Sequence, residues 1–547
     1  MRVKNQEIST LRPMLYPERH DKQTGNLMVS ETESIQQIAK SRADSLMSSV
    51  ETSRRETSLR LEARRRALMG QFLTPASVAM FMARMIECKK PVVRLLDPGA
   101  GLGSLSAAFV AEMCRRQIRP DAIAVTACEL DPMLIDYLRS TLELCKAVSE
   151  DAGIRFEARI LAKDFLEVGA NTFVGDFFSA GENERFDCAI LNPPYRKIRA
   201  ESHERKLLRA IGLETSNLYT GFLAVTSRFL TPDGEMVAIT PRSFCNGPYF
   251  EPFRRFFLKE MRFRRIQVFD ARDRAFADDA VLQENIVFRS VKTMEPPGEV
   301  VVSSSLDPGD PNPRVRTIRH DDLVRPGDPH VFIHIVPDGD GDSIRRQILN
   351  LDSTLADLGL TISTGRVVDF RAKHLLRAQP GRDTVPLIYP CHLQGGFVDW
   401  PNGRTRKANA LAVGQGAEDL LVPQGHYVLV KRFSTKEERR RVVAAVYDPE
   451  RVPSDRVAFE NHLNYYHIRG SGLPVTIAKG LAAFLNSTLV DSYFRQFSGH
   501  TQVNAADLRS FRYPARDKLV AIGRRIGKSF PDQQELDRLV GEVINRG

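Results

Sequence analysis

Four short apolar runs in the first half of the chain each end in a polar residue, and this pattern constrains the fold more than any other feature of the sequence. Each run has the length and composition of a buried strand. The polar residues at or just after their ends are Asp97, Glu129, Asp164 and Asn192. In an open α/β sheet the carboxyl ends of the strands border one ligand crevice, so we expect these four side chains to meet in one binding site.

Further apolar runs, and the helical patterns between them, predict the fold class. The first four predicted strands are 92–96, 123–128, 156–162 and 186–191. Runs at 235–239, 265–269 and 286–288 add three more strands. Helices lie between the early strands, as at 105–115, so the region from 73 to 291 is predicted to form a seven-stranded, Rossmann-like α/β sheet.

The 547 residues are too many for one hydrophobic core, so more than one domain is expected. Residues 1–69 are predicted to form a helical extension, because the second half of this segment is polar, charged and free of glycine and proline. Proline and glycine become frequent after residue 292, which predicts that the sheet domain, residues 70–300, ends there. A mixed α+β domain over 301–515 and a helical tail over 516–547 complete the expected organisation.

The composition argues against several protein classes. Hydrophobic residues make up 42% of the chain, yet no apolar run of about 18 residues occurs, so no membrane span is expected. The N-terminal residues are polar and lack the apolar segment of a secretory signal. The seven cysteines include no Cys-x-x-Cys pair, which indicates free thiols in the cytoplasm and no metal site. The net charge of +10 is compatible with a polyanionic partner.

The turn after the fourth strand has the sequence Asn192-Pro193-Pro194-Tyr195. Neither proline can donate to a strand ladder, so the strand must end here in a stiff turn. The turn offers an amide side chain, the carbonyl group of Pro193 and the aromatic ring of Tyr195. An exocyclic amino group needs two acceptors for its hydrogens and a flat surface for its ring, so this set suits such a group. A plain strand-ending turn is the alternative.

A glycine turn and its neighbours indicate a nucleotide-like ligand. Residues 97–103 lie between a predicted strand and a predicted helix and carry three glycines at alternate positions. Such a turn lets a ligand approach the backbone at a helix N-terminus, and its spacing differs from the dinucleotide motif Gly-x-Gly-x-x-Gly. An acid at the place of Glu129 accepts hydrogen bonds from ribose hydroxyls in nucleotide-binding sheets. Thr74 is predicted to cap a helix that has Pro75 at its first position.

These motifs, in this order, resemble those of the amino-group DNA methyltransferases that use S-adenosylmethionine. The resemblance is strongest to the adenine-N6 modification methylases of type II restriction-modification systems, in particular those of the BsuBI/PstI type. Their Phe-x-Thr-Pro segment precedes the glycine motif, as residues 72–75 precede 97–103 here, and their recognition domain comes last. The resemblance covers roughly residues 70–515. It implies site-specific methylation of adenine in double-stranded DNA, with a cognate restriction endonuclease acting separately.

The resemblance also implies a role for each matching residue. The target amino group would be held by Asn192 and the carbonyl group of Pro193, and Tyr195 would stack on the flipped base. A second ring, Phe250 or its neighbour Tyr249, would close the stack. The expected catalytic residues are Asn192, Pro193, Pro194, Tyr195 and Phe250. The residues that would bind S-adenosylmethionine are Phe72, Thr74, Pro75, Asp97, Gly99, Gly101, Glu129, Asp164, Phe165 and Asn192.

The later chain is rich in amide and basic side chains, which suit contacts to bases and phosphates. The DNA contacts expected from it and from the turn are Lys197, Arg432, Asn461, Asn464, His500, Gln502 and Asn504. Two alternative functions remain open. Cytosine-N4 methylation uses the same amino-group chemistry, although Asn192 occupies a position at which serine is frequent in those enzymes. A non-catalytic DNA-recognition subunit is the other alternative.

Overall fold

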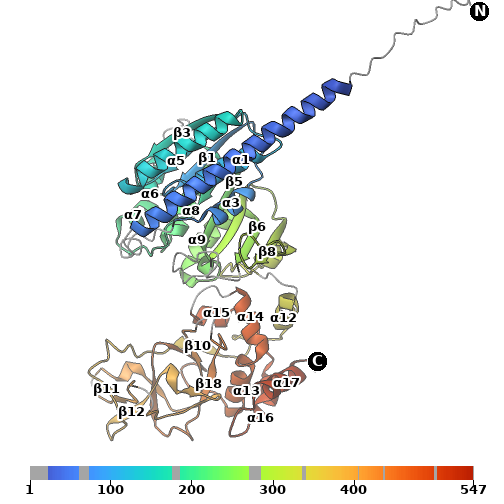
Figure 1. Cartoon of the computed structure of the whole chain (residues 1–547). Coiled ribbons are helices and arrows are strands. Elements are labelled where there is room, and N and C mark those ends of the chain that lie inside the picture. Colours follow the sequence, from blue (N-terminus) through green and yellow to red (C-terminus); the bar gives the residue numbers. More distant parts are fainter. Residues whose placement is uncertain are drawn as a thin grey trace, which may run out of the picture.

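The chain folds into two bodies, an N-terminal body up to residue 335 and a C-terminal body from residue 340 onwards, as the computed structural model in Figure 1 shows. The structure describes residues 22–60, 73–174, 185–269, 285–335, 340–403, 406–414, 416–434, 438–497 and 502–545. Among these residues, none of the helices is long and apolar enough to cross a lipid bilayer.

A sheet of nine strands, counted over the described residues, forms the centre of the N-terminal body, in the order β3-β2-β1-β4-β5-β7-β6-β8-β9. The strands are β1 (Val92–Pro98), β2 (Ala122–Cys128), β3 (Arg155–Leu161), β4 (Phe186–Leu191), β5 (Leu230–Pro241), β6 (Met261–Phe269), β7 (Asn285–Lys292), β8 (Glu299–Ser305) and β9 (Arg314–Arg319). The first five strands pair in parallel, whereas β7 is antiparallel to both of its neighbours. Every residue of β4 is buried, as expected of a central strand with helices on both faces.

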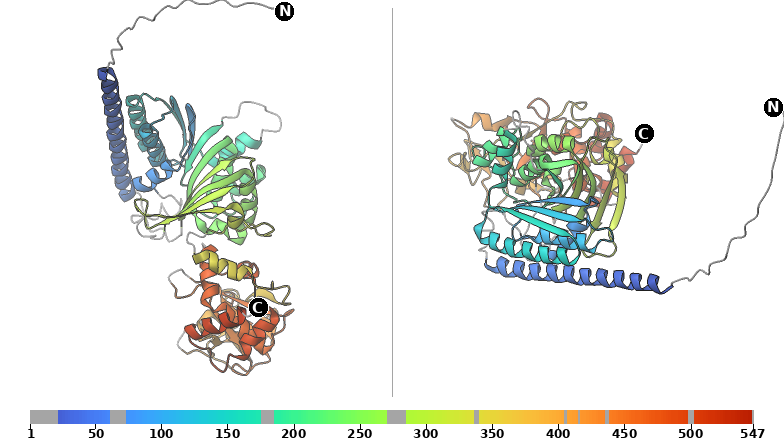
Figure 2. Two further views of the ribbon diagram at one scale, coloured as in Figure 1. Left: turned by 90° about the vertical axis from the view of Figure 1, so that its right-hand side faces the viewer. Right: turned by 90° about the horizontal axis from the view of Figure 1, so that it is seen from above.

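Helices cover both faces of this sheet, and the sheet lies between two hydrophobic core clusters (Figure 2). One face carries α1 (Lys22–Arg60), α3 (Ala76–Arg84), α4 (Ser104–Arg115) and α5 (Pro132–Asp151). The other carries α6 (Phe165–Val174), α7 (His203–Ala210), α8 (Leu218–Phe229) and α9 (Glu251–Glu260). Short 3-10 turns η1 (Arg242–Cys245) and η2 (Pro248–Phe250) connect β5 to α9, and α11 (His320–Leu323) follows β9.

The sheet continues beyond residue 300, where we expected the domain to end. It has two strands more than the seven predicted, because β8 pairs in parallel with β6 and β9 pairs with β8. Ile333 and Ile335 also belong to its core. The Pro296-Pro297-Gly298 sequence is therefore the connection between β7 and β8 within one sheet, and the change from one body to the other comes about 35 residues later.

The C-terminal body combines two small sheets with a group of helices. Its strands are β10 (Thr361–Thr364), β11 (Leu376–Arg377), β12 (Thr384–Ile388), β13 (Leu393–Gln394), β14 (Phe397–Val398), β15 (Ala410–Ala412), β16 (Leu421–Pro423), β17 (Tyr427–Lys431), β18 (Ala444–Tyr447), β19 (Arg456–Phe459) and β20 (Leu463–His467). Its helices are α12 (Asp340–Leu349), α13 (Val475–Leu485), α14 (Thr488–Phe497), α15 (Ala505–Arg509), α16 (Arg516–Arg524) and α17 (Gln533–Ile544). The sheet orders are β10-β20-β17-β18-β14-β13 and β11-β15-β12-β19-β16.

The last two helices pack into the C-terminal body, unlike the separate tail expected over 516–547. Leu519 and Ile522 of α16 are fully buried in its core. Helices α13 and α16 meet at Gly480 and Gly523, where an added Cβ would lie 1.9 Å and 1.8 Å from a backbone oxygen of the facing helix. Only glycine permits this approach, so the end of the chain is built into the body.

Helix α1 is anchored to the sheet domain by Glu51. The Glu51 carboxylate is bound by Arg54, whose side chain is 1% exposed, and accepts a hydrogen bond at 3.0 Å from the backbone nitrogen of Ala76. Ala76 is the first residue of α3, so Glu51 supplies the helix cap that we had predicted for Thr74. Burial raises the pKa of Glu51, but hydrogen bonds from Arg54, Ala76 and Arg55 outweigh burial and lower it to about 2.

Replacing Glu51 by glutamine should lower the free energy of unfolding by about 1 kcal/mol at pH 7, because the cap loses its charge. The folded pKa lies below the unfolded value of 4.5, so the wild-type contribution is present above pH 4.5 and disappears as the pH falls towards 2. Glu56→Gln, at an exposed position of the same helix, is the control. Denaturant unfolding of the three proteins at pH 7 and pH 3 measures the effect. An equal loss in both variants would contradict the capping role.

Candidate active site

A cavity lies at the carboxyl edge of the sheet, and it is lined by residues that follow four neighbouring strands. Gly99 and Gly101 follow β1, Glu129 follows β2, Asp164 follows β3, and Asn192 follows β4. The structure thus brings together the strand ends that were expected to meet. The complete lining is Leu73, Gly99, Gly101, Cys128, Glu129, Leu130, Leu134, Lys163, Asp164, Phe165, Leu166, Asn192, Pro194, Arg196, Glu204, Leu218 and Phe222.

The glycine turn bends the backbone so that it forms one wall of the cavity. Gly99, Gly101 and Gly103 all have positive φ angles, of 76°, 59° and 89°, which other residues adopt only with strain. The turn is fixed to the end of β2, since the backbone nitrogen of Gly99 donates to the carbonyl oxygen of Cys128 at 2.9 Å. Bare backbone at this wall permits a ligand to approach closely.

Glu129 forms a rigid acidic group beside this turn. Its carboxylate accepts hydrogen bonds from the backbone nitrogens of Gly101, Leu130 and Asp131, at 2.7, 2.9 and 2.8 Å. The residue is 5% exposed, and burial raises the pKa of its carboxyl group despite these bonds. Two carboxylate oxygens have about four acceptor sites, so three backbone donors leave capacity for a donor from a ligand.

Asp97 lies behind the glycine turn and does not line the cavity. It is fully buried and accepts a hydrogen bond from the Ser106 hydroxyl at 2.6 Å. Burial raises its pKa to about 7, with the nearby charge of Glu129 adding to the rise. Asp97 therefore holds the start of α4 from inside the protein and, unlike the predicted site residues Gly99 and Glu129, is not part of the cavity lining.

The apolar side of the cavity comes from Phe165 and from helix α8. The ring of Phe165 lies 5.2 Å from that of Phe222, and Leu218 lines the cavity beside them. Asp164 directly precedes α6 and accepts a hydrogen bond from the backbone nitrogen of Leu166 at 2.7 Å. The sequence identified Asp164 and Phe165 but missed the two α8 residues, because an apolar helix carries no mark that distinguishes a cavity wall from core.

The Asn192 side chain has a fixed orientation. Its Nδ2 donates to the Thr74 hydroxyl at 3.1 Å, and its Oδ1 accepts a hydrogen bond from the Tyr195 hydroxyl at 2.8 Å. Thr74 thus positions the amide across the sheet edge, while Pro75 serves as the N-cap residue of α3 and is not part of the cavity lining. Burial raises the pKa of the Tyr195 phenol, so this hydroxyl stays protonated and remains a donor.

An aromatic cluster extends from the turn towards η2. The Tyr219 ring lies 6.2 Å from that of Tyr195, at an interplanar angle of 83°, and 5.7 Å from that of Phe250. Phe250 is 7% exposed, whereas the neighbouring Tyr249 is 77% exposed. The two candidates for the second stacking ring therefore differ sharply: one packs into the protein beside Tyr219, and the other lies on the surface.

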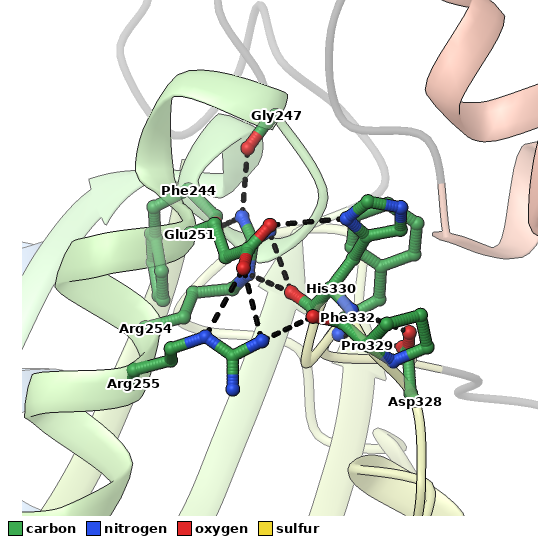
Figure 3. A network of polar contacts seen from close by, with 9 residues as sticks. All are labelled: Phe244, Gly247, Glu251, Arg254, Arg255, Asp328, Pro329, His330 and Phe332. Atoms are coloured by element: carbon green, nitrogen blue, oxygen red, sulfur yellow. Dashed lines mark hydrogen bonds and ion pairs between the residues drawn. The ribbon is translucent and has the colours of Figure 1, made fainter.

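Arg254 fixes the segment that carries both rings (Figure 3). It is fully buried and donates to the carbonyl oxygens of Phe244 and Gly247, at 2.9 and 2.8 Å, and to that of His330 at 2.8 Å. Glu251 completes the network by accepting from a ring nitrogen of His330 at 3.0 Å. The sequence did not predict these contacts, since His330 lies some 75 residues after Arg254.

Charged residues at the cavity mouth were also missed by the sequence. Arg196 and Glu204 both line the cavity and form an ion pair at 2.7 Å, and Lys163 lies on the same lining. The predicted DNA contact Lys197 is exposed next to them and pairs through its backbone with Asn217. Lys163 and Arg196 follow strand ends whose polar groups had already been assigned, and Glu204 lies on α7, so the sequence pattern did not single them out.

Several predicted DNA contacts of the C-terminal body meet in the fold. Nη1 of Arg432 donates to the backbone oxygen of Asn461 at 2.7 Å, and the strand segment at Phe433 pairs with Gln502. Asn504 is the N-cap residue of α15 and donates its backbone N–H to Asp507 at 2.8 Å. Arg432, Asn461, Gln502 and Asn504 therefore lie in one neighbourhood, although they are far apart in the sequence.

Asn464 requires a correction. It is fully buried on β20, where its Nδ2 donates to the carbonyl oxygen of Val503 at 2.8 Å and its Oδ1 accepts from Thr364 at 3.2 Å. Such a side chain holds strands together and cannot reach a base in this conformation. Phe72 and His500, which were predicted to bind cofactor and DNA, lie outside the described residues.

Replacing Asp97 by asparagine should change how stability depends on pH. The folded pKa of about 7 exceeds the ordinary 3.8, so the folded protein binds this proton more tightly than the unfolded chain. The wild type therefore loses stability as the pH rises from about 4 to 7, and the variant lacks this loss. The melting temperature of the variant, relative to wild type, should rise between pH 5 and pH 8. Asp121→Asn, at an exposed position, is the control; a parallel pH dependence of all three proteins would contradict the assignment.

The chain is similar to several known proteins. A family model described as Eco57I restriction-modification methylase matches residues 117–276. The chain is 40% identical over 479 residues to the type II methyltransferase M.PstI of Providencia stuartii, covering 88% of this chain and 93% of that protein. It is 42% identical over 483 residues to the type II methyltransferase M.BsuBI of Bacillus subtilis, covering 87% and 94%. A solved DrdV–DNA complex overlaps 84% of this chain and 57% of its own, with a TM-score of 0.45 and 14% identity.

Proposed function

Because the chain belongs to the type II methyltransferases of restriction-modification systems, we propose that it methylates N6 of adenine in double-stranded DNA, with S-adenosylmethionine as the methyl donor. The predicted resemblance to methylases of the BsuBI/PstI type is confirmed. The proposed chemistry rests on the orientation of the Asn192 amide. Its nitrogen donates to the Thr74 hydroxyl, so its oxygen is the atom that can accept a hydrogen bond from the target amino group.

The Asn-Pro-Pro-Tyr turn supplies the groups that an exocyclic amino group needs. Such an amino group is a weak nucleophile, because its lone pair is delocalised into the ring. Oδ1 of Asn192 and the carbonyl oxygen of Pro193 would each accept one of its hydrogens and favour a tetrahedral nitrogen with a localised lone pair. An amide oxygen accepts two hydrogen bonds, so the Tyr195 hydroxyl and the target can share it.

The cavity fits S-adenosylmethionine in its donor set. Bare backbone at Gly99 and Gly101 admits the ligand, and the acceptor capacity of Glu129 suits ribose hydroxyls. Asp164 and the Phe165 ring would hold the adenine moiety, between an acceptor and an apolar wall. The bound cofactor supplies a methyl group activated by a sulfonium ion. Holding this group in line with the target nitrogen can contribute as much as about 7–11 kcal/mol to lowering the barrier.

The target base must leave the duplex before it can reach Asn192, at a cost of a few kcal/mol. Stacking on Tyr195 and on one ring of η2 would offset about 1–3 kcal/mol per contact. Phe250 is the better supported second ring, because it packs beside Tyr219 in the cluster that contains Tyr195, whereas Tyr249 is directed into solvent.

The C-terminal body would read the DNA sequence while the sheet domain performs the transfer. It carries the remaining predicted DNA contacts, Arg432, Asn461, Gln502 and Asn504, in one neighbourhood. A separate restriction endonuclease that cleaves the same, unmethylated site would be the functional partner of such an enzyme.

Transfer should depend completely on Asn192. Wild-type protein with tritiated S-adenosylmethionine and duplex DNA should yield N6-methyladenine after digestion to nucleosides. Asn192→Ala should retain the melting temperature and lose transfer by at least about a hundredfold, because one of the two acceptors is missing. Asn171→Ala, at an exposed position of α6, is the control. N4-methylcytosine in the digest would move the protein to the cytosine class, and near wild-type transfer by Asn192→Ala would refute the role of the turn.

Cofactor binding should depend on Glu129. Glu129→Ala removes the acceptor for ribose hydroxyls and the anchor of the glycine turn, so affinity for S-adenosylmethionine should fall at least about tenfold, or 1.4 kcal/mol. Titration calorimetry on the full chain measures this. Glu157→Ala, at an exposed position of β3, should bind as the wild type does. If all three proteins bound S-adenosylmethionine with equal affinity, the cofactor would have to bind away from Glu129.

A further inference from the structure

His462 lies on the surface of the C-terminal body with one ring nitrogen held by a buried acid. Its side chain is 47% exposed, whereas that of Glu460 is 1% exposed. The Glu460 carboxyl group accepts hydrogen bonds from Nδ1 of His462 at 2.5 Å and from its backbone nitrogen at 2.9 Å. The ring orientation is therefore fixed, and Nε2, at the opposite side of the imidazole, is the nitrogen that can face a partner.

Phe433 and Arg432 stand beside this histidine. Phe433 is 39% exposed, and its ring lies 4.9 Å from that of His462. The Arg432 guanidinium lies 6.0 Å from the Phe433 ring and is held by its bond to the backbone of Asn461. One surface patch, formed by Arg432, Phe433 and His462, thus combines positive charge, an apolar ring and an oriented hydrogen-bonding edge.

The patch adjoins the part of the C-terminal body that faces the sheet domain. The backbone oxygen of Arg432 accepts from Val503 at 2.7 Å, and α15 begins two residues after Val503. The Arg325 side chain of the N-terminal body donates to the Tyr493 hydroxyl of α14 at 2.8 Å. Figure 1 shows α15 next to α14, on the side of the C-terminal body that faces the sheet domain.

A stabilising role explains the Glu460–His462 pair poorly. Desolvating a carboxylate costs several kcal/mol, and a pair with a half-exposed partner returns little of it. The desolvation cost is expected when the carboxylate holds an imidazole ring in one orientation for recognition, as buried carboxylates do for other functional histidines. The exposed ring of Phe433 also favours a role in recognition, because leaving an aromatic ring in contact with water is unfavourable.

We propose that His462 contacts a base edge of double-stranded DNA and determines part of the recognised sequence, that Glu460 is its positioning residue, and that Phe433 packs against the same base pair. This inference rests on the proposed function of the C-terminal body. In the major groove, Nε2 can accept from the amino group of adenine or cytosine, or donate to N7 or O6 of guanine when the ring is protonated. Phe433 offers apolar surface to a thymine methyl group.

The test compares discrimination between duplexes. Sequencing of DNA from a host that expresses the full chain identifies the methylated site. Binding and methyl transfer are then measured on this duplex and on a set in which each base pair is replaced in turn. His462→Ala should reduce discrimination roughly ten- to hundredfold at one base-pair position and leave the others unchanged. Glu460→Gln should weaken discrimination at the same position. The salt dependence of binding should not change, because no phosphate contact is lost.

Controls separate recognition from folding. His374→Ala, at an exposed position of the same body, should behave as the wild type, and melting temperatures show whether each variant folds. If His462→Ala folds poorly, His462→Gln and Phe433→Leu test the same position. Unchanged discrimination in these variants, or an equal loss on every duplex, would overturn the proposal. Selective binding by the wild type without methyl transfer would instead contradict the proposed function.

Discussion

The hydrogen bond from the Asn192 amide to the Thr74 hydroxyl ties together parts of the chain that no local pattern connects. Thr74 sits just before α3, and the first turn of α3 is capped by Glu51 from α1. The orientation of the acceptor at the sheet edge therefore depends on a helix that lies on the outer face of the domain. None of the described residues of the N-terminal helix lines the cavity, yet the helix is in this way part of the support of the active site.

Buried acids lie at and behind the cavity wall, and backbone donors offset the cost of burying Glu129. Asp97 and Glu129 are almost fully buried with raised pKa values, and Glu129 is compensated by three backbone N–H groups of the glycine turn and the end of β2. Such a site is preorganised and negative, which suits a ligand that carries hydroxyl donors and a positive sulfonium centre. The electrostatics of the site are thus consistent with the proposed cofactor.

Residues at strand ends could be predicted from the sequence, and residues that act through distant contacts could not. Glu129 and Asn192 follow strands that are recognisable locally, so their meeting at one edge follows from the topology of parallel sheets. Phe222 belongs to an apolar helix and Arg254 to an amphipathic one, and their roles depend on partners such as Phe165 and His330. The prolines near residue 297 predicted a domain boundary because a turn within a sheet and an interdomain linker have the same composition. The burial of Asn464 could not be predicted from the sequence either, since a polar residue in a strand can face the core or the solvent.

The most direct test of the account is a crystal structure of the full chain with its duplex site and S-adenosylhomocysteine. The target adenine should lie outside the duplex, with its N6 within hydrogen-bonding distance of Asn192 Oδ1 and the Pro193 carbonyl oxygen, and with its ring stacked on Tyr195. Thr74 should still hold the Asn192 nitrogen. A target base bound elsewhere, or an Asn192 amide turned so that its nitrogen faces the base, would contradict the central claim.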